Sequence, residues 1–241
     1  MYHLLIINGW SANSHFWDTF IDDLPDLYSC QVIDLDSTMD LTDCCELIDS
    51  YVQDNTLLMG WSLGGMVAAK YAALSTKRFL GVITLQATPC FVEKTDWPYA
   101  LPVDELKSLR GVVESNNLKL LIRNFSNLLV SGSQQYKEDR RQLKPIYTEG
   151  NLCSVSALLL GLDLLLKLDL RKDYQNIKVP FMAIFGEHDV LVSVKQVDEI
   201  KALFPVHEFH VINGMAHFPC GAHRQQVLER LECFVAALDC M

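Results

Sequence analysis

The most constraining feature of this sequence is a serine between glycines, at the point where an apolar run meets a helix-like stretch. Residues 57–59 are apolar, residues 60–65 have the sequence GWSLGG, and residues 66–74 follow a helical pattern. A sharp strand-to-helix turn of this G-x-S-x-G kind lifts a serine hydroxyl away from the backbone, where a base can activate it. Glycines flank such a turn because a Cβ would collide with the neighbouring strand or helix. The motif therefore predicts that Ser62 is a nucleophile.

An acid and a histidine follow Ser62 in the chain order that this kind of turn requires. Residues 179–185 have the pattern of a buried strand, and Asp189 comes just after them. Residues 208–212 predict another strand, and His217 comes shortly after it. Because the carboxyl ends of parallel strands meet at one edge of a sheet, we expect the three side chains to converge there. His217 is then the base, and Asp189 fixes its tautomer.

Each member of this set also has an ordinary structural explanation. An aspartate after a strand is commonly a plain loop residue, and the chain contains seven histidines. His188 is the nearest competitor to His217, but it adjoins the acid and lies on the wrong loop to act as the base. We favour the catalytic interpretation because all three elements occur in the required order and context.

Two backbone N–H groups are candidates for an oxyanion hole. One belongs to Leu63, directly after the nucleophile, where the helix dipole favours a developing negative charge. The other is expected in the loop after an early strand. Residues 3–7 predict that strand, and Trp10 lies in the turn that follows. The Trp10 indole is also a candidate for lining an acyl pocket, the alternative being an ordinary packing role.

Strand-like and helix-like segments alternate over most of the chain, which predicts a mostly parallel sheet covered by helices on both faces. The alternation stops between Ala87 and Ile177, where the pattern is helical. We therefore expect a core of residues 1–94 and 168–241, with residues 95–167 inserted as a helical cap before the strand that leads to the acid. The predicted strands are 4–7, 30–33, 56–59, 80–85, 181–185 and 208–212, and the last predicted helix is 225–238.

Composition and charge argue against several classes of function. Half of the 241 residues are hydrophobic, and the net charge is −10, which disfavours general binding to nucleic acid or to anionic membranes. The most apolar stretch, residues 157–170, contains charged residues and is too short to span a bilayer. No signal-peptide pattern opens the chain. We expect a cytoplasmic protein that acts as a monomer.

Neither metal nor cofactor is expected. The eight cysteines form no C-x-x-C pair, and no Cys/His spacing suits zinc. We expect reduced thiols, mostly acting as small buried hydrophobic residues. Cys220 lies near His217 in sequence, but Ser62 already occupies the nucleophile position. A Ser-His-Asp mechanism needs neither a metal nor an organic cofactor.

Residues 115–148 carry a charge opposite in sign to that of the whole chain, with six basic and two acidic residues. Charge alone leaves two interpretations. The segment is either a docking surface for an anionic partner or a solvated helical face, which is the usual meaning of such runs.

Several runs of residues resemble the pimeloyl-acyl-carrier-protein methyl ester esterases of biotin synthesis, a family within the α/β-hydrolase superfamily. The resemblance covers nearly the whole chain. Its runs are NGW at 8–10, GWSLGG at 60–65, ATPCF at 87–91 with DWP at 96–98, GLDLL at 161–165 with DLR at 169–171, and AHFP at 216–219. The family usually has His where this chain has Asn8, so we expect a different hydrogen bond to orient the oxyanion loop.

The resemblance implies an α/β-hydrolase fold and hydrolysis of the methyl ester of a pimeloyl chain carried on acyl carrier protein. It maps the family's triad onto Ser62, Asp189 and His217, and the oxyanion donors onto Trp10 and Leu63. It implies a substrate-binding set made of Trp10, His217 and a cap segment comprising Phe125, Ser126, Asn127, Leu128 and Leu129. It also implies that basic cap residues contact the acidic carrier protein, here Lys119, Arg123, Lys137 and Arg141.

Two other kinds of function stay open on the sequence alone. The first is another hydrolase of the superfamily, such as a general short-chain carboxylesterase, a thioesterase or a C–C hydrolase, because the triad is shared and the cap sets the substrate. The second is a small-molecule-binding sensor with a vestigial triad. The complete set of candidate residues, with both glycines of the turn, argues against a sensor.

Overall fold

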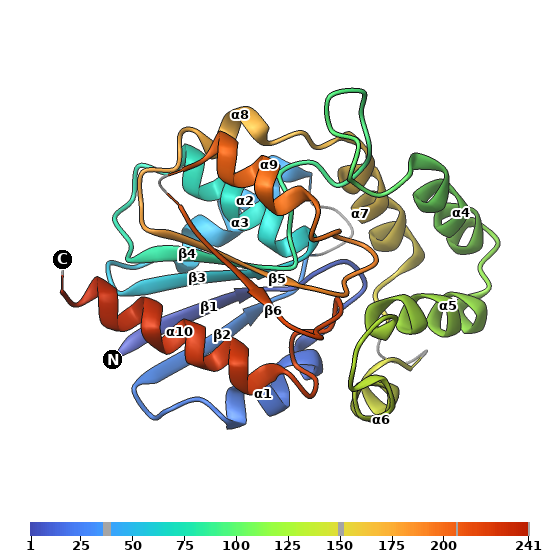
Figure 1. Ribbon diagram of the computed structural model, residues 1–241, viewed down its shortest axis with the longest axis horizontal. Helices are drawn as coiled ribbons and strands as arrows, with labels where there is room; N and C mark the ends of the chain where they lie inside the picture. The colour runs from blue at the N-terminus through green and yellow to red at the C-terminus, as the bar shows by residue number, and fades with distance from the viewer. Residues whose placement is uncertain (36–39, 149–151, 206, 241) are drawn as a thin grey trace.

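The computed structural model describes residues 1–35, 40–148, 152–205 and 207–240. Within them, six strands form one parallel sheet in the order β2-β1-β3-β4-β5-β6 (Figure 1). The strands are β1 (Tyr2–Ile7), β2 (Tyr28–Ile33), β3 (Thr56–Trp61), β4 (Gly81–Leu85), β5 (Phe181–Gly186) and β6 (Glu208–Ile212).

Helices cover both faces of this sheet (Figure 1). One face carries α1 (Asp18–Asp22) and α10 (Arg224–Leu238), and the other carries α2 (Leu41–Tyr51), α3 (Leu63–Leu74) and α9 (Gln196–Leu203). Strands β3, β4 and β5 are buried along their whole length, which is why their sequences are continuously apolar instead of alternating. The short helices η1 (Ser14–Trp17) and α8 (Arg171–Tyr174) complete the core.

In the described part of the chain, four further helices form the cap, which is inserted between β4 and β5 and lies beside the sheet (Figure 1). They are α4 (Val103–Glu114), α5 (Leu118–Val130), α6 (Tyr136–Ile146) and α7 (Val155–Lys167). Helix α4 packs against α5 and α7, and α5 packs against α6. Side-chain caps start two of them: Asn117 accepts from the amide of Leu120 (3.1 Å), and Ser154 accepts from that of Ala157 (3.2 Å).

The predicted fold, an α/β-hydrolase sheet with a helical insertion before the strand that leads to Asp189, is confirmed. Every predicted strand is present, and only the boundaries differ. Strand β3 continues through Trp61, and α3 begins at Leu63, three residues before the helical pattern becomes visible. The elbow glycines hide that first turn of the helix from a pattern based on apolar periodicity. Among the described residues, no helix combines the length and apolar character needed to cross a membrane.

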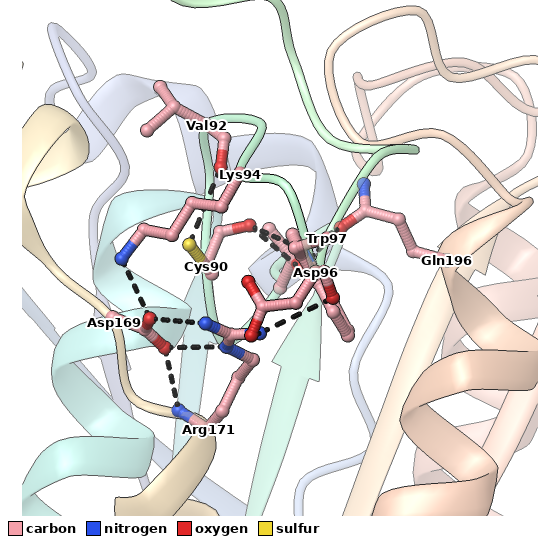
Figure 2. Close-up of polar contacts among 9 residues, drawn as sticks. Cys90, Val92, Lys94, Asp96, Trp97, Asp169, Arg171 and Gln196 are labelled. Atoms are coloured by element: carbon pink, nitrogen blue, oxygen red, sulfur yellow. Dashed lines mark hydrogen bonds and ion pairs between the residues drawn. The ribbon is translucent and has the colours of Figure 1, made fainter.

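A polar network joins the two chain segments that lead into and out of the cap (Figure 2). Asp169, just after α7, accepts bonds from Lys94 Nζ (2.7 Å) and from Nε and Nη2 of Arg171 (2.8 and 2.7 Å). Arg171 also donates to Asp96 (2.9 Å), and its guanidinium carbon lies 5.5 Å from the Trp97 ring centroid. The hydrogen bonds from Arg171 hold the pKa of Asp169 well below its ordinary value. We call these five residues the hinge network.

The hinge network is anchored to the core through an indole. Trp97 Nε1 donates to the Cys90 carbonyl and to Gln196 Oε1, each at 3.0 Å. Thr88 Oγ1 donates to the same Gln196 oxygen (2.7 Å). Gln196 begins α9, so both ends of the cap are tied to a helix that packs on the sheet (Figures 1 and 2).

Candidate active site

Ser62 stands in the tight turn between β3 and α3, with φ 53° and ψ −119°. A positive φ is strained for a serine, and it persists only where the surroundings fix it. Two glycines provide the necessary space. A Cβ on Gly60 would overlap the carbonyl of Gly64, and a Cβ on Gly64 would overlap the carbonyl of Ile7. The turn therefore needs both glycines, as the sequence predicts.

The side chains of Ser62, His217 and Asp189 form one hydrogen-bonded series. Ser62 Oγ lies 3.0 Å from His217 Nε2, and His217 Nδ1 lies 2.7 Å from Asp189 Oδ2. The exposed fractions of these residues are 6%, 1% and 6%, so water is largely excluded. The other carboxylate oxygen, Oδ1, accepts the amides of Leu191 (2.8 Å) and Val192 (2.9 Å), which fixes the carboxylate plane. The structure thus brings together all three residues that the sequence selects.

Two competitors for these roles lie elsewhere. His188 Nδ1 is 2.8 Å from the carbonyl of Gly132, between α5 and α6, and its ring is not part of the series. Cys220 is completely buried, and burial raises the pKa of its thiol well above the ordinary value. Its thiolate form is therefore suppressed, which fits a structural role. Within the described residues, no cluster of three or more His, Cys, Asp or Glu side chains is arranged to hold a metal ion.

Both candidate oxyanion donors lie at the same sheet edge as Ser62. Leu63 is the first residue of α3, so its N–H lacks an intrahelical partner. Trp10 lies in a turn that the Ala12 amide closes on the Gly9 carbonyl (3.3 Å). Neither N–H group makes a hydrogen bond within the described part of the chain. Both remain available to an incoming oxygen, which is the arrangement that an oxyanion hole requires.

Asn8 orients the oxyanion loop through two hydrogen bonds. Its side chain is buried, accepts from Trp17 Nε1 (2.5 Å) and donates to a carboxylate oxygen of Asp34. The substitution of Asn for the histidine of the resembling family is therefore accommodated by a local polar network. Sequence reasoning expected a different bond here but offered no way to identify Trp17 and Asp34 as its partners.

An apolar cavity opens beside Ser62, between the core and the cap. Among the described residues, the only charged one in its lining is Glu105, which is exposed. The lining residues are Trp10, Ser62, Phe91, Leu101, Glu105, Leu106, Leu109, Phe125, Leu128, Leu165 and Leu191. Such a lining suits an aliphatic chain, and Ser62 is part of it.

The residues of the run 125–129, expected to line the substrate channel, lie on different sides of α5. Phe125 and Leu128 line the cavity, whereas Ser126, Asn127 and Leu129 do not. Ser126 lines a separate surface hollow, Asn127 accepts a hydrogen bond from Arg140, and Leu129 is buried in the core. The cause is helical geometry, because successive residues of α5 point in directions about 100° apart.

The four basic residues expected to dock a carrier fall into two groups. Lys119 and Arg123 of α5 line a surface hollow whose other lining residues are Ile122, Ser126, Arg140, Leu143, Lys144 and Tyr147. We call this the basic hollow. Its four cations lack an acidic partner within the described residues, and no carboxylate lines it. Lys137 and Arg141 are exposed on α6 outside the hollow, and Arg141 pairs with Glu138 (2.6 Å).

One residue that positions the site is missing from the sequence prediction. Trp61 Nε1 donates to the backbone carbonyl of His217 (2.9 Å), and the two rings lie 5.3 Å apart. Phe16 stacks on Trp61, with centroids 4.2 Å apart, and contacts Phe218 (5.1 Å). The residue before the nucleophile thus holds the loop of the histidine. Its position inside the GWSLGG run was the available signal.

Comparison with known proteins places these features in a family. Residues 46–223, about three quarters of the chain, match the model of the alpha/beta hydrolase fold family. This chain is an α/β-hydrolase. Other α/β-hydrolases thus provide the reference for its elbow turn, its cap and the edge where its candidate residues meet.

Solved structures similar to this α/β-hydrolase include proteins that are named for different activities. A bromoperoxidase from Bacillus anthracis superposes with a TM-score of 0.84 at 19% identity, covering 98% of this chain and 92% of that one. An esterase from Exiguobacterium antarcticum gives 0.81 at 18% identity, with the same coverages. An esterase from Thermogutta terrifontis gives 0.74 at 16%, covering 99% and 90%. At such identities the likeness establishes the fold.

Proposed function

We propose that this α/β-hydrolase is a serine carboxylesterase that hydrolyses the methyl ester of a pimeloyl chain carried on acyl carrier protein. The observation that carries the proposal is the buried series Ser62–His217–Asp189, whose serine lines an apolar cavity between the core and the cap. A hydroxyl, an imidazole and a carboxylate in this order are the groups that acyl transfer to serine requires.

The reaction proceeds in two halves. Ser62 Oγ attacks the ester carbonyl while His217 Nε2 accepts the hydroxyl proton, and the N–H groups of Trp10 and Leu63 bind the oxyanion. Asp189 stabilises the imidazolium. The carbon–oxygen bond to methanol then breaks, and His217 gives methanol its proton. A water molecule, deprotonated by His217, attacks the acyl-enzyme, frees the carboxylate and returns the proton to Ser62.

Two features support the substrate. The cavity lining is apolar, which suits the methylene chain of a pimeloyl group. The basic hollow collects four cations in a chain of net charge −10, which suits an acidic partner that approaches over the cap. Together with the resemblance to the carrier-ester esterases, these two features support one substrate, the pimeloyl methyl ester carried on acyl carrier protein. On the same basis we propose that the enzyme acts as a cytoplasmic monomer without a cofactor.

Incubation with methyl pimeloyl-acyl carrier protein tests the proposal directly. Mass spectrometry of the intact carrier should show conversion of the methyl ester to the free acid by the natural chain. Ser62→Ala should slow this conversion at least about 10⁴-fold, with an unchanged circular dichroism spectrum. A Ser62→Ala variant that retains near-normal turnover would rule out the serine mechanism.

A general carboxylesterase acting on free short esters is the second candidate. It is favoured by the apolar lining of the cavity, in which exposed Glu105 is the only charged side chain among the residues that the structure describes. Competition between the carrier-linked methyl ester, free methyl esters and thioesters ranks these possibilities. A kcat/KM that is no higher for the carrier-linked ester would favour the general enzyme. Ligand-dependent signalling that survives Ser62→Ala would instead favour a sensor.

A further inference from the structure

The turn that presents Trp10 has an unusual backbone. Ser11, the next residue, has φ 59°, a left-handed conformation that suits glycine and is unfavourable for serine. The turn is closed by the bond from the Ala12 amide to the Gly9 carbonyl. A strained residue of this kind persists only where neighbouring groups hold it in place. The structure therefore needs a restraint on Ser11.

Tyr147 provides that restraint from the cap. Its hydroxyl and Ser11 Oγ are 2.5 Å apart, and both residues are buried. Tyr147 directly follows α6, so this bond joins the cap to the turn over 136 positions of sequence. Burial raises the pKa of the Tyr147 hydroxyl above its ordinary value, so the hydroxyl stays protonated. The pair forms a directional contact on the residue beside Trp10.

Other cap residues hold the Trp10 side chain. The Phe125 ring meets the Trp10 ring edge-on, with centroids 4.6 Å apart and an 88° interplanar angle. Trp10 Nε1 donates to the Leu158 carbonyl of α7 (2.8 Å). The Tyr147 ring lies 6.0 Å from that of Phe125. These contacts fix the indole, whereas the bond to Ser11 fixes the backbone that carries the Trp10 N–H.

We infer that Tyr147 is a positioning residue of the oxyanion hole, which keeps the Trp10 N–H directed at the reacting oxygen by holding Ser11. The inference rests on the proposed function, because it gives the Trp10 N–H its catalytic task. Oxyanion donors act only when they are preorganised within a narrow geometric range. Ester hydrolysis is therefore coupled to the seating of the cap, since a displaced α6 withdraws the hydroxyl that restrains the turn.

Tyr147→Phe tests the inference in two backgrounds, the natural chain and Ser11→Gly. Glycine adopts the positive φ without strain and lacks the Oγ atom, so the Tyr147 hydroxyl has no task in that background. With p-nitrophenyl butyrate, we expect Tyr147→Phe to lower kcat about 10-fold in the natural background, with little change in KM. In the Ser11→Gly background we expect less than about a 2-fold loss.

A second measurement separates positioning from packing. An alkyl boronic acid bonds to Ser62 Oγ through boron, which becomes tetrahedral and anionic while the hydroxyl proton moves to His217. An oxygen on boron then occupies the oxyanion site. Tyr147→Phe should weaken this inhibitor about as much as it lowers kcat, and leave binding of a linear alcohol in the apolar cavity unchanged. Ser11→Ala should reproduce both effects, and it replaces Tyr147→Phe if that variant fails to fold.

The possible failures are distinguishable. The inference is overturned if the natural enzyme is active and Tyr147→Phe lowers kcat by the same factor in both backgrounds. It is also overturned if Tyr147→Phe alters KM alone. The proposed function itself fails, and the inference with it, if the natural chain and Ser62→Ala are equally inactive and equally indifferent to the boronic acid.

Discussion

The indole N–H of Trp61 donates to the backbone carbonyl of His217 at 2.9 Å, so the residue before the nucleophile fixes the main chain of the histidine that contacts that nucleophile. The bond spans 156 positions and is buried. It makes the relative position of the two side chains depend on one hydrogen bond, in addition to the 3.0 Å contact between Ser62 Oγ and His217 Nε2.

Trp61→Phe keeps most of the apolar volume and removes the donor. The buried carbonyl of His217 then lacks its partner, which costs about 1–3 kcal/mol of stability, and we expect kcat to fall about 10-fold as the imidazole loses its orientation. Trp97→Phe is the matched control, because it removes the buried indole hydrogen bonds that anchor the hinge network to Cys90 and Gln196. Both variants should lower Tm, but only Trp61→Phe should lower kcat strongly. Equal losses of kcat would contradict the positioning role.

Asp189→Asn should leave the fold intact and remove most activity. Oδ1 accepts two backbone amides, so the new amide group has to place its oxygen there and its NH₂ toward His217 Nδ1. The imidazole then carries its proton on Nε2 and cannot accept one from Ser62. In a serine protease this exchange costs about 10⁴-fold in kcat, and we expect a similar order here. A kcat within 10-fold of the natural value, at any pH from 6 to about 9, would contradict the assignment.

Two glycine-to-alanine substitutions should have opposite effects on stability. A Cβ at Gly64 overlaps the carbonyls of Ile7 and Asn8, so Gly64→Ala should cost at least about 2 kcal/mol and distort the elbow. Gly111 lies within α4, and a Cβ there meets nothing within 4 Å. Gly111→Ala should therefore stabilise the chain by about 0.5–1 kcal/mol. Urea unfolding measures both, and a stable Gly64→Ala would contradict the packing argument.

The sequence predicts those features that depend on local pattern and chain order. Uninterrupted apolar runs locate the central strands, and the elbow fixes Ser62. Parallel topology then brings Asp189 and His217 to the same edge, where the structure places them. The positions of these residues can be predicted without knowing how the cap packs.

Contacts between the cap and the core could not be predicted in the same way. The pair Ser11–Tyr147 joins a turn to the end of a cap helix, and no local periodicity connects the two residues. A continuous run such as residues 125–129 also conceals which side chains share a face of α5 until its partner helices are known. Which cap residues contact the core depends on side-chain direction, and the packing of the four cap helices sets that direction.

Arg171→Gln should destabilise the chain at neutral pH and not in strong acid. Hydrogen bonds from Arg171 hold the pKa of Asp169 below its ordinary value of 3.8. Their stabilisation is therefore present above about pH 4 and is lost as the pH falls through the folded-state pKa. We expect a loss of about 2 kcal/mol at pH 7, shrinking as the pH falls below about 4. Urea unfolding at a series of pH values measures the difference.

The matched control for the hinge network is Arg141→Gln. That change removes an ion pair with Glu138 on the exposed side of α6, where solvent screens the charges. It should leave the unfolding midpoint unchanged at every pH. The linkage to Asp169 would be contradicted if Arg171→Gln lowered the free energy of unfolding by the same amount at every pH. It would also be contradicted if the two substitutions lowered that free energy equally.

Charge reversal in the basic hollow should weaken hydrolysis of the carrier-linked ester more than that of a free methyl ester. The hollow's cations lack an acidic partner among the described residues, whereas Arg141 is already paired with Glu138. The double variant Arg140→Glu/Lys144→Glu should therefore lower the ratio of the two kcat/KM values about 10-fold at low salt. Lys137→Glu/Arg141→Glu, which reverses two charges outside the hollow, should lower it less.

Ionic strength separates docking from a change in the cap. Exposed charges are screened over about 10 Å at 0.1 M salt, so added salt should lower the ratio for the natural chain and narrow its difference from Arg140→Glu/Lys144→Glu. A salt-independent ratio would indicate that the substitutions act through the structure of α6. If both double variants lower the ratio equally, the carrier contacts the whole exposed side of α6, and the basic hollow has no particular role in docking. If neither lowers it, the basic residues of the cap do not bind the carrier, and the segment is a solvated helical face.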